Sequence, residues 1–285
     1  MATIPQTTAD QPLRTAGVLH PGSMGVTVGA ALRHGGTPVL WASSGRGPAT
    51  RDRAAEAGLR DVTTLDALCS SSDVVLSVCP PDAALDLARG VAATGFSGVF
   101  VDANAVSPRT ALEIGAIVTD GGAEFVDGGI IGEPAHRPGT TRLYLAGAAA
   151  SSVAALFHGA ALEARVLDQP PGAASALKVA YAAYTKGTAA LLLTVQAFAK
   201  GAGIDEALRS EWALSQPELL ARADGVGSAA APKAWRWVGE MHEIAAACAD
   251  AGLPDGFHEA SAEVFRRLSG FKDTERAGVE EVLDQ

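Results

Sequence analysis

The sequence predicts an α/β domain built on a parallel sheet, followed by an all-α domain. Short β-rich runs alternate with alanine-rich helical stretches over residues 15–167, which is typical of a parallel sheet covered by helices. Pro170-Pro171-Gly172 then interrupts the chain. Beyond this break the β-rich signal ends, and a long alanine-rich stretch begins at residue 173.

Length and composition set limits on the function. With 285 residues, of which 48% are hydrophobic and 19% charged, the chain is long enough for two domains. We expect a disordered tail at residues 1–12, a cofactor domain at 13–169 and a helical domain at 170–285. The formal net charge of -10 provides no basic domain to follow a phosphate backbone, which argues against nucleic-acid binding.

The cysteines, the histidines and the first residues favour a cytoplasmic protein without a metal site. Cys69, Cys79 and Cys248 have no C-x-x-C spacing, which suits a reducing compartment. The chain starts with polar residues and has neither a signal-peptide core nor a run of membrane length. The six histidines do not show the spacing of a metal site.

The region around residues 16–41 predicts a strand, a glycine loop, a helix and a second strand. An apolar run leads into a loop whose Gly22 and Gly25 hold two positions of a G-x-G-x-x-G pattern, while His20 holds the first. Such a loop brings the backbone close to a pyrophosphate at a helix N-terminus. The pattern indicates a Rossmann-type, doubly wound sheet. The candidate phosphate-loop residues are His20, Pro21, Gly22, Ser23, Met24 and Gly25.

Two later strands are expected to end at the same crevice. One covers residues 73–78 and the other residues 98–102, and Ser107-Pro108 then caps a helix. We assign Cys79, Pro80 and Asn104 to the cofactor site, with Asn104 bonding the nicotinamide ribose or amide; an asparagine after a strand is also a routine turn former. Further strands are expected at residues 123–127, 142–146 and 164–167, and a helix from Ser151.

The end of the second strand indicates the cofactor. An NAD-binding fold usually has an acidic residue there, about 20 residues beyond the glycine loop, to bind the ribose 2′-hydroxyl. Here the chain has Ser43, Ser44 and Arg46 instead. These side chains suit a 2′-phosphate, so we expect NADP(H) to be preferred over NAD(H). Arg51 is a weaker candidate, because it is also a helix-surface residue.

The second domain is expected to be all α. The stretch at residues 173–200 has apolar or small residues on most sides, which predicts burial by other helices or by a partner subunit. We therefore expect a homodimer. Further helices are expected at residues 205–214, 217–223, 234–251 and 255–268.

The chain resembles the β-hydroxyacid dehydrogenases and the 6-phosphogluconate dehydrogenase superfamily in four places. These are the phosphate loop with Met24-Gly25, Val101-Asp102-Ala103-Asn104 with the residues up to Pro108, Phe125 to Gly132, and Gly172 to Lys178. The resemblance implies an α-helical second domain, dimerisation, and a lysine acid/base at Lys178. The region from Trp235 to Ile244 resembles a helical domain of relatives whose substrates are mostly unassigned.

Two departures from this family affect the substrate. Where relatives have Ser-Gly-Gly to hold a substrate carboxylate, this chain has Ile131-Gly132-Glu133. Three residues after Lys178, where the family usually has Asn or His, stands Tyr181. We assign Ile131, Gly132, Lys178, Tyr181 and Thr185 to substrate binding.

The resulting hypothesis is an NADPH-dependent oxidoreductase that interconverts a small alcohol and a carbonyl. Negative charge grows on oxygen during carbonyl reduction, so a proton donor is needed. Lys178 is the candidate general acid/base, and Tyr181 and Thr185 share its helix face. Two alternatives remain: an imine reductase, in which Lys178 matters less, and a sensor that binds NADP(H) without turnover.

Overall fold

The computed structural model describes residues 13–272 and Leu283, so the tail expected at residues 1–12 lies outside the described residues. The chain divides into two compact units, Met1–Lys178 and Val179–Gln285. Each unit is described by itself below.

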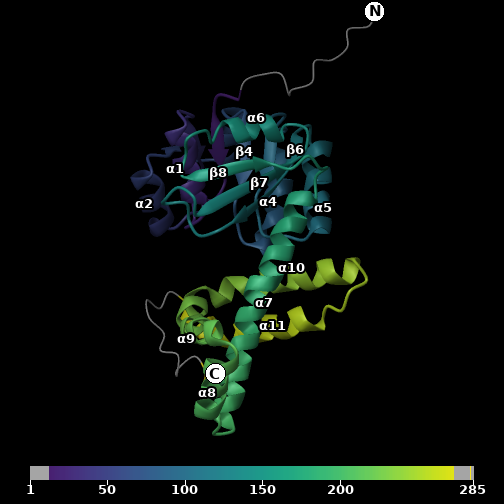
Figure 1. The fold of residues 1–285 in the computed structure, drawn as a ribbon. Helices are drawn as coiled ribbons and strands as arrows, with labels where there is room; N and C mark the ends of the chain where they lie inside the picture. The colour runs from purple at the N-terminus through teal and green to yellow at the C-terminus, as the bar shows by residue number, and fades with distance from the viewer. Residues whose placement is uncertain (1–12, 273–282, 284–285) are drawn as a thin grey trace, which may run out of the picture. The chain divides into compact units, whose positions relative to one another are not determined.

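The first unit is built on one eight-stranded sheet (Figure 1). Its strand order, β3-β2-β1-β4-β5-β6-β7-β8, begins with the order of the doubly wound dinucleotide-binding fold. The predicted α/β class is therefore confirmed. The strands are β1 (Ala16–Val18), β2 (Val39–Trp41), β3 (Arg60–Asp61), β4 (Val74–Ser77), β5 (Val99–Asp102), β6 (Glu124–Ile131), β7 (Thr141–Ala146) and β8 (Leu162–Val166).

Two strands depart from the parallel sheet that the sequence predicts. β7 runs antiparallel to β6, with Ile131 opposite Arg142, and β8 runs parallel to β7 and so shares its reversed direction. The connection between β6 and β7, residues 132–140, contains no helix. A parallel connection needs a crossover of about a dozen or more residues, usually helical, so the chain returns along the sheet in the opposite direction.

Helices cover both faces of the sheet and create two cores. The strands alternate between them: Val74 and Leu76 of β4 belong to one core, and Val75 belongs to the other. Burial on both faces explains the continuous apolar runs in the sequence. The helices of this unit are α1 (Gly25–His34), α2 (Pro48–Glu56), α3 (Leu65–Ser70), α4 (Pro81–Ala93), α5 (Pro108–Asp120) and α6 (Ala150–Ala155).

The second unit is helical in its described residues, as the sequence predicts. Helix α7 (Ala173–Gly201) begins in the first unit and continues into the second. The other helices are α8 (Asp205–Ser215), α9 (Pro217–Ala230), α10 (Ala234–Asp250) and α11 (Gly256–Arg267), with short 3-10 turns at Ala231–Lys233 and Leu268–Phe271. Helix α9 continues past Ala223, where the sequence analysis ended it, because Gly227 and Ala230 are buried by packing.

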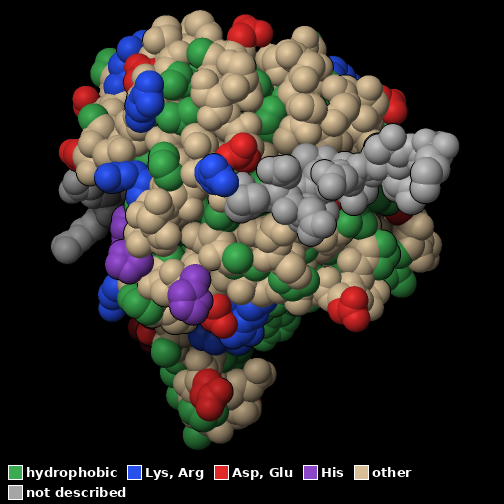
Figure 2. Space-filling view, turned by 90° about the horizontal axis from the view of Figure 1, so that it is seen from above, with side chains coloured by type: hydrophobic (Ala, Val, Ile, Leu, Met, Phe, Trp, Pro, Cys, Tyr) green, Lys and Arg blue, Asp and Glu red, His purple; other side chains and the backbone are tan. Residues whose placement is uncertain are grey.

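In the described part of the chain, no helix combines the length and apolar character needed to cross a membrane. On the face seen in Figure 2, basic and acidic side chains are scattered among apolar and neutral ones.

Asp127 holds the start of α7 against the sheet. Its carboxylate is fully buried. Oδ2 accepts hydrogen bonds from the backbone N–H groups of Gly172 and Ala174 (2.8 Å each) and of Ser175 (3.1 Å), and Oδ1 accepts one from the Ser175 hydroxyl at 2.5 Å. A carboxylate at this position satisfies N–H groups that have no partner within the helix and faces the positive end of the helix dipole.

The glycines after Asp127 allow α7 to approach the sheet closely. A β-carbon at Gly129 would lie 2.6 Å from the carbonyl oxygen of Ala174 and 3.1 Å from Cβ of Lys178. Contacts this short are not tolerated in close-packed interiors. Asp127 and Gly129 together fix the first turns of α7, and with them Lys178, against β6.

Replacing Asp127 by Ala is expected to lower the free energy of unfolding by about 3 kcal/mol, because buried N–H groups lose their acceptor. Urea unfolding followed by circular dichroism measures this change. The control is Ser175→Ala, which removes only one of the four bonds and should cost about 1 kcal/mol. Equal losses in the two variants would contradict the role given to Asp127.

Candidate cofactor site

The glycine loop lies where the fold places a cofactor, between the end of β1 and the start of α1. A β-carbon at Gly25 would collide with the carbonyl oxygen of His20, so this position requires glycine. The first turn of α1 contains no acidic residue, and Met24 at its N-cap makes no capping side-chain bond. An anion at this helix N-terminus would therefore meet the positive end of the helix dipole and no negative or capping side chain of α1. The strand–loop–helix–strand order predicted for this region is confirmed.

His20 makes a side-chain contact that the glycine of the usual pattern could not make. Its Nδ1 lies 2.8 Å from a terminal nitrogen of Arg46. Arginine has only donors, so Nδ1 accepts and the ring is neutral, with its proton on Nε2. Burial lowers the pKa of His20 below 6.5, and the positive charges of Arg46 and Arg53 lower it further. A β-carbon at Gly22 would lie 3.2 Å from the ring, so glycine makes room for it.

Three arginines surround the loop and the end of β2. Arg46 also donates to the carbonyl oxygen of Leu19 at 3.3 Å. Arg51 donates to the carbonyl oxygens of Arg46 and Ser43, at 3.1 Å each. Arg53 donates to the hydroxyl of Thr50 at 3.1 Å, and its Nε lies 3.5 Å from the carbonyl oxygen of Pro21. Each of these acceptors is uncharged, so none of these contacts neutralises the guanidinium charge.

A carboxylate that the sequence analysis missed lies beside β2. Asp61, at the end of β3, accepts hydrogen bonds from the backbone N–H groups of Ser43 (3.2 Å) and Thr63 (2.7 Å). Desolvation opposes ionisation of Asp61, but hydrogen bonds from Ser43 and Thr63, together with the positive charge of Arg51, outweigh it and lower the pKa. Ser43 is 3% exposed. Of the two serines assigned to the cofactor, Ser43 is therefore held by Asp61, and Ser44 is exposed.

Asn104 joins the ends of β4 and β5. Its side-chain oxygen accepts from the backbone N–H of Cys79 at 2.6 Å, and its amide nitrogen donates to the Ser77 hydroxyl at 3.0 Å and to the Asp102 carboxylate. Asn104 is 2% exposed, so it shapes the crevice through Cys79 and Pro80. Burial raises the pKa of the Cys79 thiol to about 12, which keeps it protonated.

The predicted substrate loop follows β6. Ile131 is buried and ends the strand. Gly132 has φ +126, and a β-carbon there would collide with the carbonyl oxygen of Thr140, so only glycine fits. The carbonyl oxygen of Glu133 accepts a hydrogen bond from Thr141 at 2.5 Å. Gly132 and Glu133 are both exposed.

The structure places the predicted catalytic residues on α7. Lys178 is half-buried at the end of the first unit, against Gly129. Tyr181 and Thr185 belong to the second unit, where Tyr181 is 48% exposed. The Thr185 hydroxyl donates to the carbonyl oxygen of Tyr181 at 3.1 Å. That these three side chains meet at one substrate stays a prediction.

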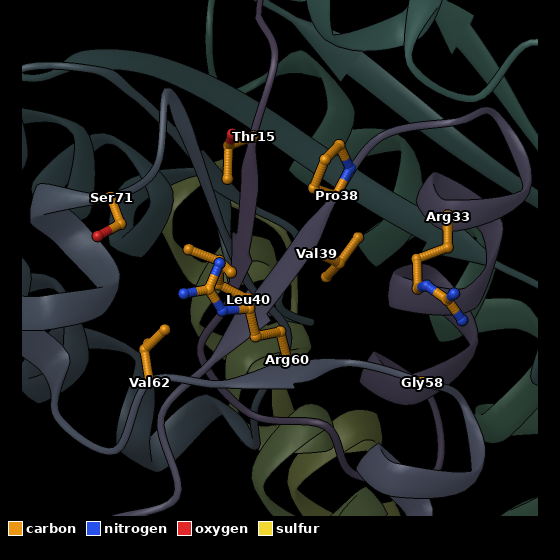
Figure 3. Close-up of a pocket in the computed structure, with 9 residues that line it drawn as sticks. All are labelled: Thr15, Arg33, Pro38, Val39, Leu40, Gly58, Arg60, Val62 and Ser71. Atoms are coloured by element: carbon orange, nitrogen blue, oxygen red, sulfur yellow. The ribbon is translucent and has the colours of Figure 1, made fainter.

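A hollow of about 500 Å³ lies elsewhere in the first unit (Figure 3). Its lining includes Thr15, Pro38 and Ser71, which precede β1, β2 and β4. It therefore opens at the amino ends of these strands, whereas cofactors of doubly wound folds bind at the carboxyl ends. We do not assign it to the cofactor site. In the described part of the chain, no group of His, Cys, Asp and Glu side chains is arranged to hold a metal ion.

Comparison with known proteins gives one domain family and one curated relative. Residues 199–268 match the family described as Domain of unknown function (DUF1932). An uncharacterized 28.5 kDa protein of Methanothermus fervidus is 33% identical over 166 residues, which is 58% of this chain. The match spans 63% of that relative's own length.

Solved structures match nearly the whole chain. The conserved protein MTH1747, reported to be structurally similar to 3-hydroxyacid dehydrogenases, is 27% identical, covers 90% of this chain and 97% of its own, and gives a TM-score of 0.68. The 3-hydroxyisobutyrate dehydrogenase of Mycobacterium tuberculosis is 17% identical, with 95% and 98% coverage and a TM-score of 0.68. A reductive aminase from Aspergillus terreus, in complex with NADPH4, is 18% identical, with 95% and 98% coverage and a TM-score of 0.56.

The first unit is therefore a Rossmann-type domain with a glycine loop at the carboxyl end of β1, and it is followed by a helical unit. This is the fold of the 3-hydroxyacid dehydrogenases, and the likeness to MTH1747 supports the superfamily that the motifs predict.

Proposed function

We propose that the protein is an NADPH-dependent oxidoreductase that interconverts a small alcohol and a carbonyl compound. The observation that carries this proposal is the pairing of the glycine loop with a lysine held against β6 in the same unit. The likeness to 3-hydroxyacid dehydrogenases supports the reaction class. The three free cysteines favour the reducing conditions of the cytoplasm.

The preference for NADP(H) is supported by the charge around the loop. Elsewhere in the described chain, Arg89, Arg165 and Arg209 pair with carboxylates. The hydrogen bonds of Arg46 go to neutral acceptors, so its positive charge remains available to a phosphate, whereas the charge of Arg51 also stabilises the Asp61 carboxylate. Asp61 gives the opposite indication, because a carboxylate near the end of β2 suits the ribose 2′-hydroxyl of NAD.

Lys178 is the proposed general acid/base. The nicotinamide supplies or accepts the hydride when it is bound. In reduction, the Lys178 ammonium donates a proton to the oxygen on which negative charge develops, and in alcohol oxidation the neutral amine removes that proton. Tyr181 is the second proposed catalytic residue, and we assign Ile131, Gly132, Tyr181 and Thr185 to the substrate. Reduction of an imine is the alternative, favoured by the likeness to the reductive aminase.

A homodimer through α7 is also proposed. Leu177, Tyr181, Tyr184, Thr188, Leu191, Val195 and Phe198 follow one another at alternating intervals of four and three residues, the spacing of a helix–helix seam. Five large side chains of this row are exposed: Leu177 (36%), Tyr181 (48%), Tyr184 (64%), Leu191 (50%) and Phe198 (71%). Exposed apolar surface of this kind marks an interaction site.

Calorimetric titration with NADPH and NADH tests the cofactor proposal. We expect wild-type protein to bind NADPH more tightly, and Arg46→Ala to weaken NADPH binding by about 10- to 100-fold, because a charge-assisted contact is lost. The matched control is Arg89→Ala, which removes the same charge from a surface pair. Tighter binding of NADH, lost in Asp61→Ala, would contradict the NADP preference.

Turnover assays test Lys178. With 3-hydroxyisobutyrate and NADP⁺ as the first probe, Lys178→Ala is expected to lower kcat by about 10²- to 10⁴-fold, the range of general acid–base catalysis. Turnover of cyclohexanone with allylamine that survives this substitution would favour the imine reductase instead. Tight cofactor binding without turnover across a carbonyl and imine panel would favour the sensor.

Sedimentation velocity tests the dimer. Wild-type protein is expected to sediment as a dimer, and the double substitution Leu191→Glu with Phe198→Glu as a monomer, because charges in an apolar seam stay unpaired. Leu112→Glu is the matched control, since Leu112 is 52% exposed on α5 and lies outside the row. A dimer that survives the double substitution would contradict this interface.

A further inference from the structure

We propose that His20 is a specificity-determining residue: it positions Arg46 for the 2′-phosphate of NADP(H) by accepting a hydrogen bond from its guanidinium. The inference deepens the proposed function and rests on it. It gives a role to His20 at the first position of the G-x-G-x-x-G pattern, where glycine is usual.

The geometry supports a positioning role. Nδ1 of His20 and the carbonyl oxygen of Leu19 accept from the two terminal nitrogens of Arg46, at 2.8 and 3.3 Å. A long side chain that starts beyond the end of β2 is thereby fastened to the end of β1. Arginine has five N–H groups, so Nε and one N–H on each terminal nitrogen remain for a ligand.

The protonation of His20 supports the same role. Only a neutral imidazole with the proton on Nε2 can accept from Arg46, and burial, Arg46 and Arg53 all favour the neutral form. Because the pKa is lowered in the folded protein, the unfolded chain binds the proton more readily. The contribution of neutral His20 to stability is therefore present above pH 6.5 and is lost as the pH falls below that value.

The His20 ring also leaves the glycines of the loop in place for pyrophosphate binding. His20 is turned over Gly22, where no side chain competes for the space. The collision that a side chain at Gly25 would cause is avoided as well, so the loop keeps both remaining glycines of its pattern. The replacement of the first glycine is thus compatible with a bound pyrophosphate.

Three variants separate this role from simple packing. His20→Phe keeps a ring of similar size and removes the acceptor. His20→Asn places an amide oxygen close to the position of Nδ1 and keeps the acceptor. Arg46→Ala removes the donor, and the double variant His20→Phe with Arg46→Ala shows whether the two residues act together.

The measurement is the ratio of the dissociation constants for NADH and NADPH in each variant. The same ratio for adenosine 5′-monophosphate and adenosine 2′,5′-bisphosphate excludes any effect at the nicotinamide. A general loosening of the loop weakens both ligands and cancels in the ratio. We expect His20→Phe to reduce the preference for the 2′-phosphate about tenfold, His20→Asn to retain it, and the double variant to match Arg46→Ala.

A histidine NMR titration reports the protonation state of His20, which a packing role alone would not fix. In wild-type protein, saturating adenosine 2′,5′-bisphosphate should leave the His20–Arg46 bond in place and His20 neutral at pH 7. A preference unchanged in His20→Phe, or effects of the two substitutions that simply add, would overturn the inference while leaving the proposed function intact. A wild-type protein that binds neither NADPH nor NADH would overturn the proposed function itself, and the inference with it.

Discussion

The buried carboxylate of Asp127 is the interaction on which the site depends. It joins the middle of β6 to the first turn of α7 through four hydrogen bonds. Its burial would cost several kcal/mol without such partners, so the bonds form together or the arrangement is lost. This joint and the close approach at Gly129 fix the start of α7 and so place Lys178 against the sheet.

The sequence predicts the parts of the fold whose signals are local. The glycine loop after β1, the helix that follows it and the Ser107-Pro108 start of α5 each depend on a few adjacent residues, and all three are confirmed. The role of Asp127 in fastening α7 was not predicted, because its partner Gly172 lies 45 residues further along the chain. The direction of β7 was missed for a similar reason, since strand pairing is decided by distant segments.

The candidate site shows the same limit. The pattern at residues 43–46 indicates Arg46 as a cofactor residue. It does not show that His20 accepts a hydrogen bond from Arg46, because His20 follows β1 and Arg46 follows β2. Asp61 was missed because β3 has only two residues, both exposed, and shows no apolar pattern. Ser43 and Ser44 look equivalent in the sequence, yet Asp61 engages one of them and leaves the other exposed.

The neutral hydrogen-bond acceptors of Arg46 explain how an acidic protein can provide an anion site. A chain with a net charge of -10 offers many carboxylates to any guanidinium, and Arg266 and Arg267 both pair with Glu263. Around the glycine loop, Arg46 is instead oriented by an imidazole and a carbonyl oxygen. Neutral acceptors fix the direction of a cation without cancelling its charge, so a phosphate meets a positioned positive group and no counterion has to be displaced.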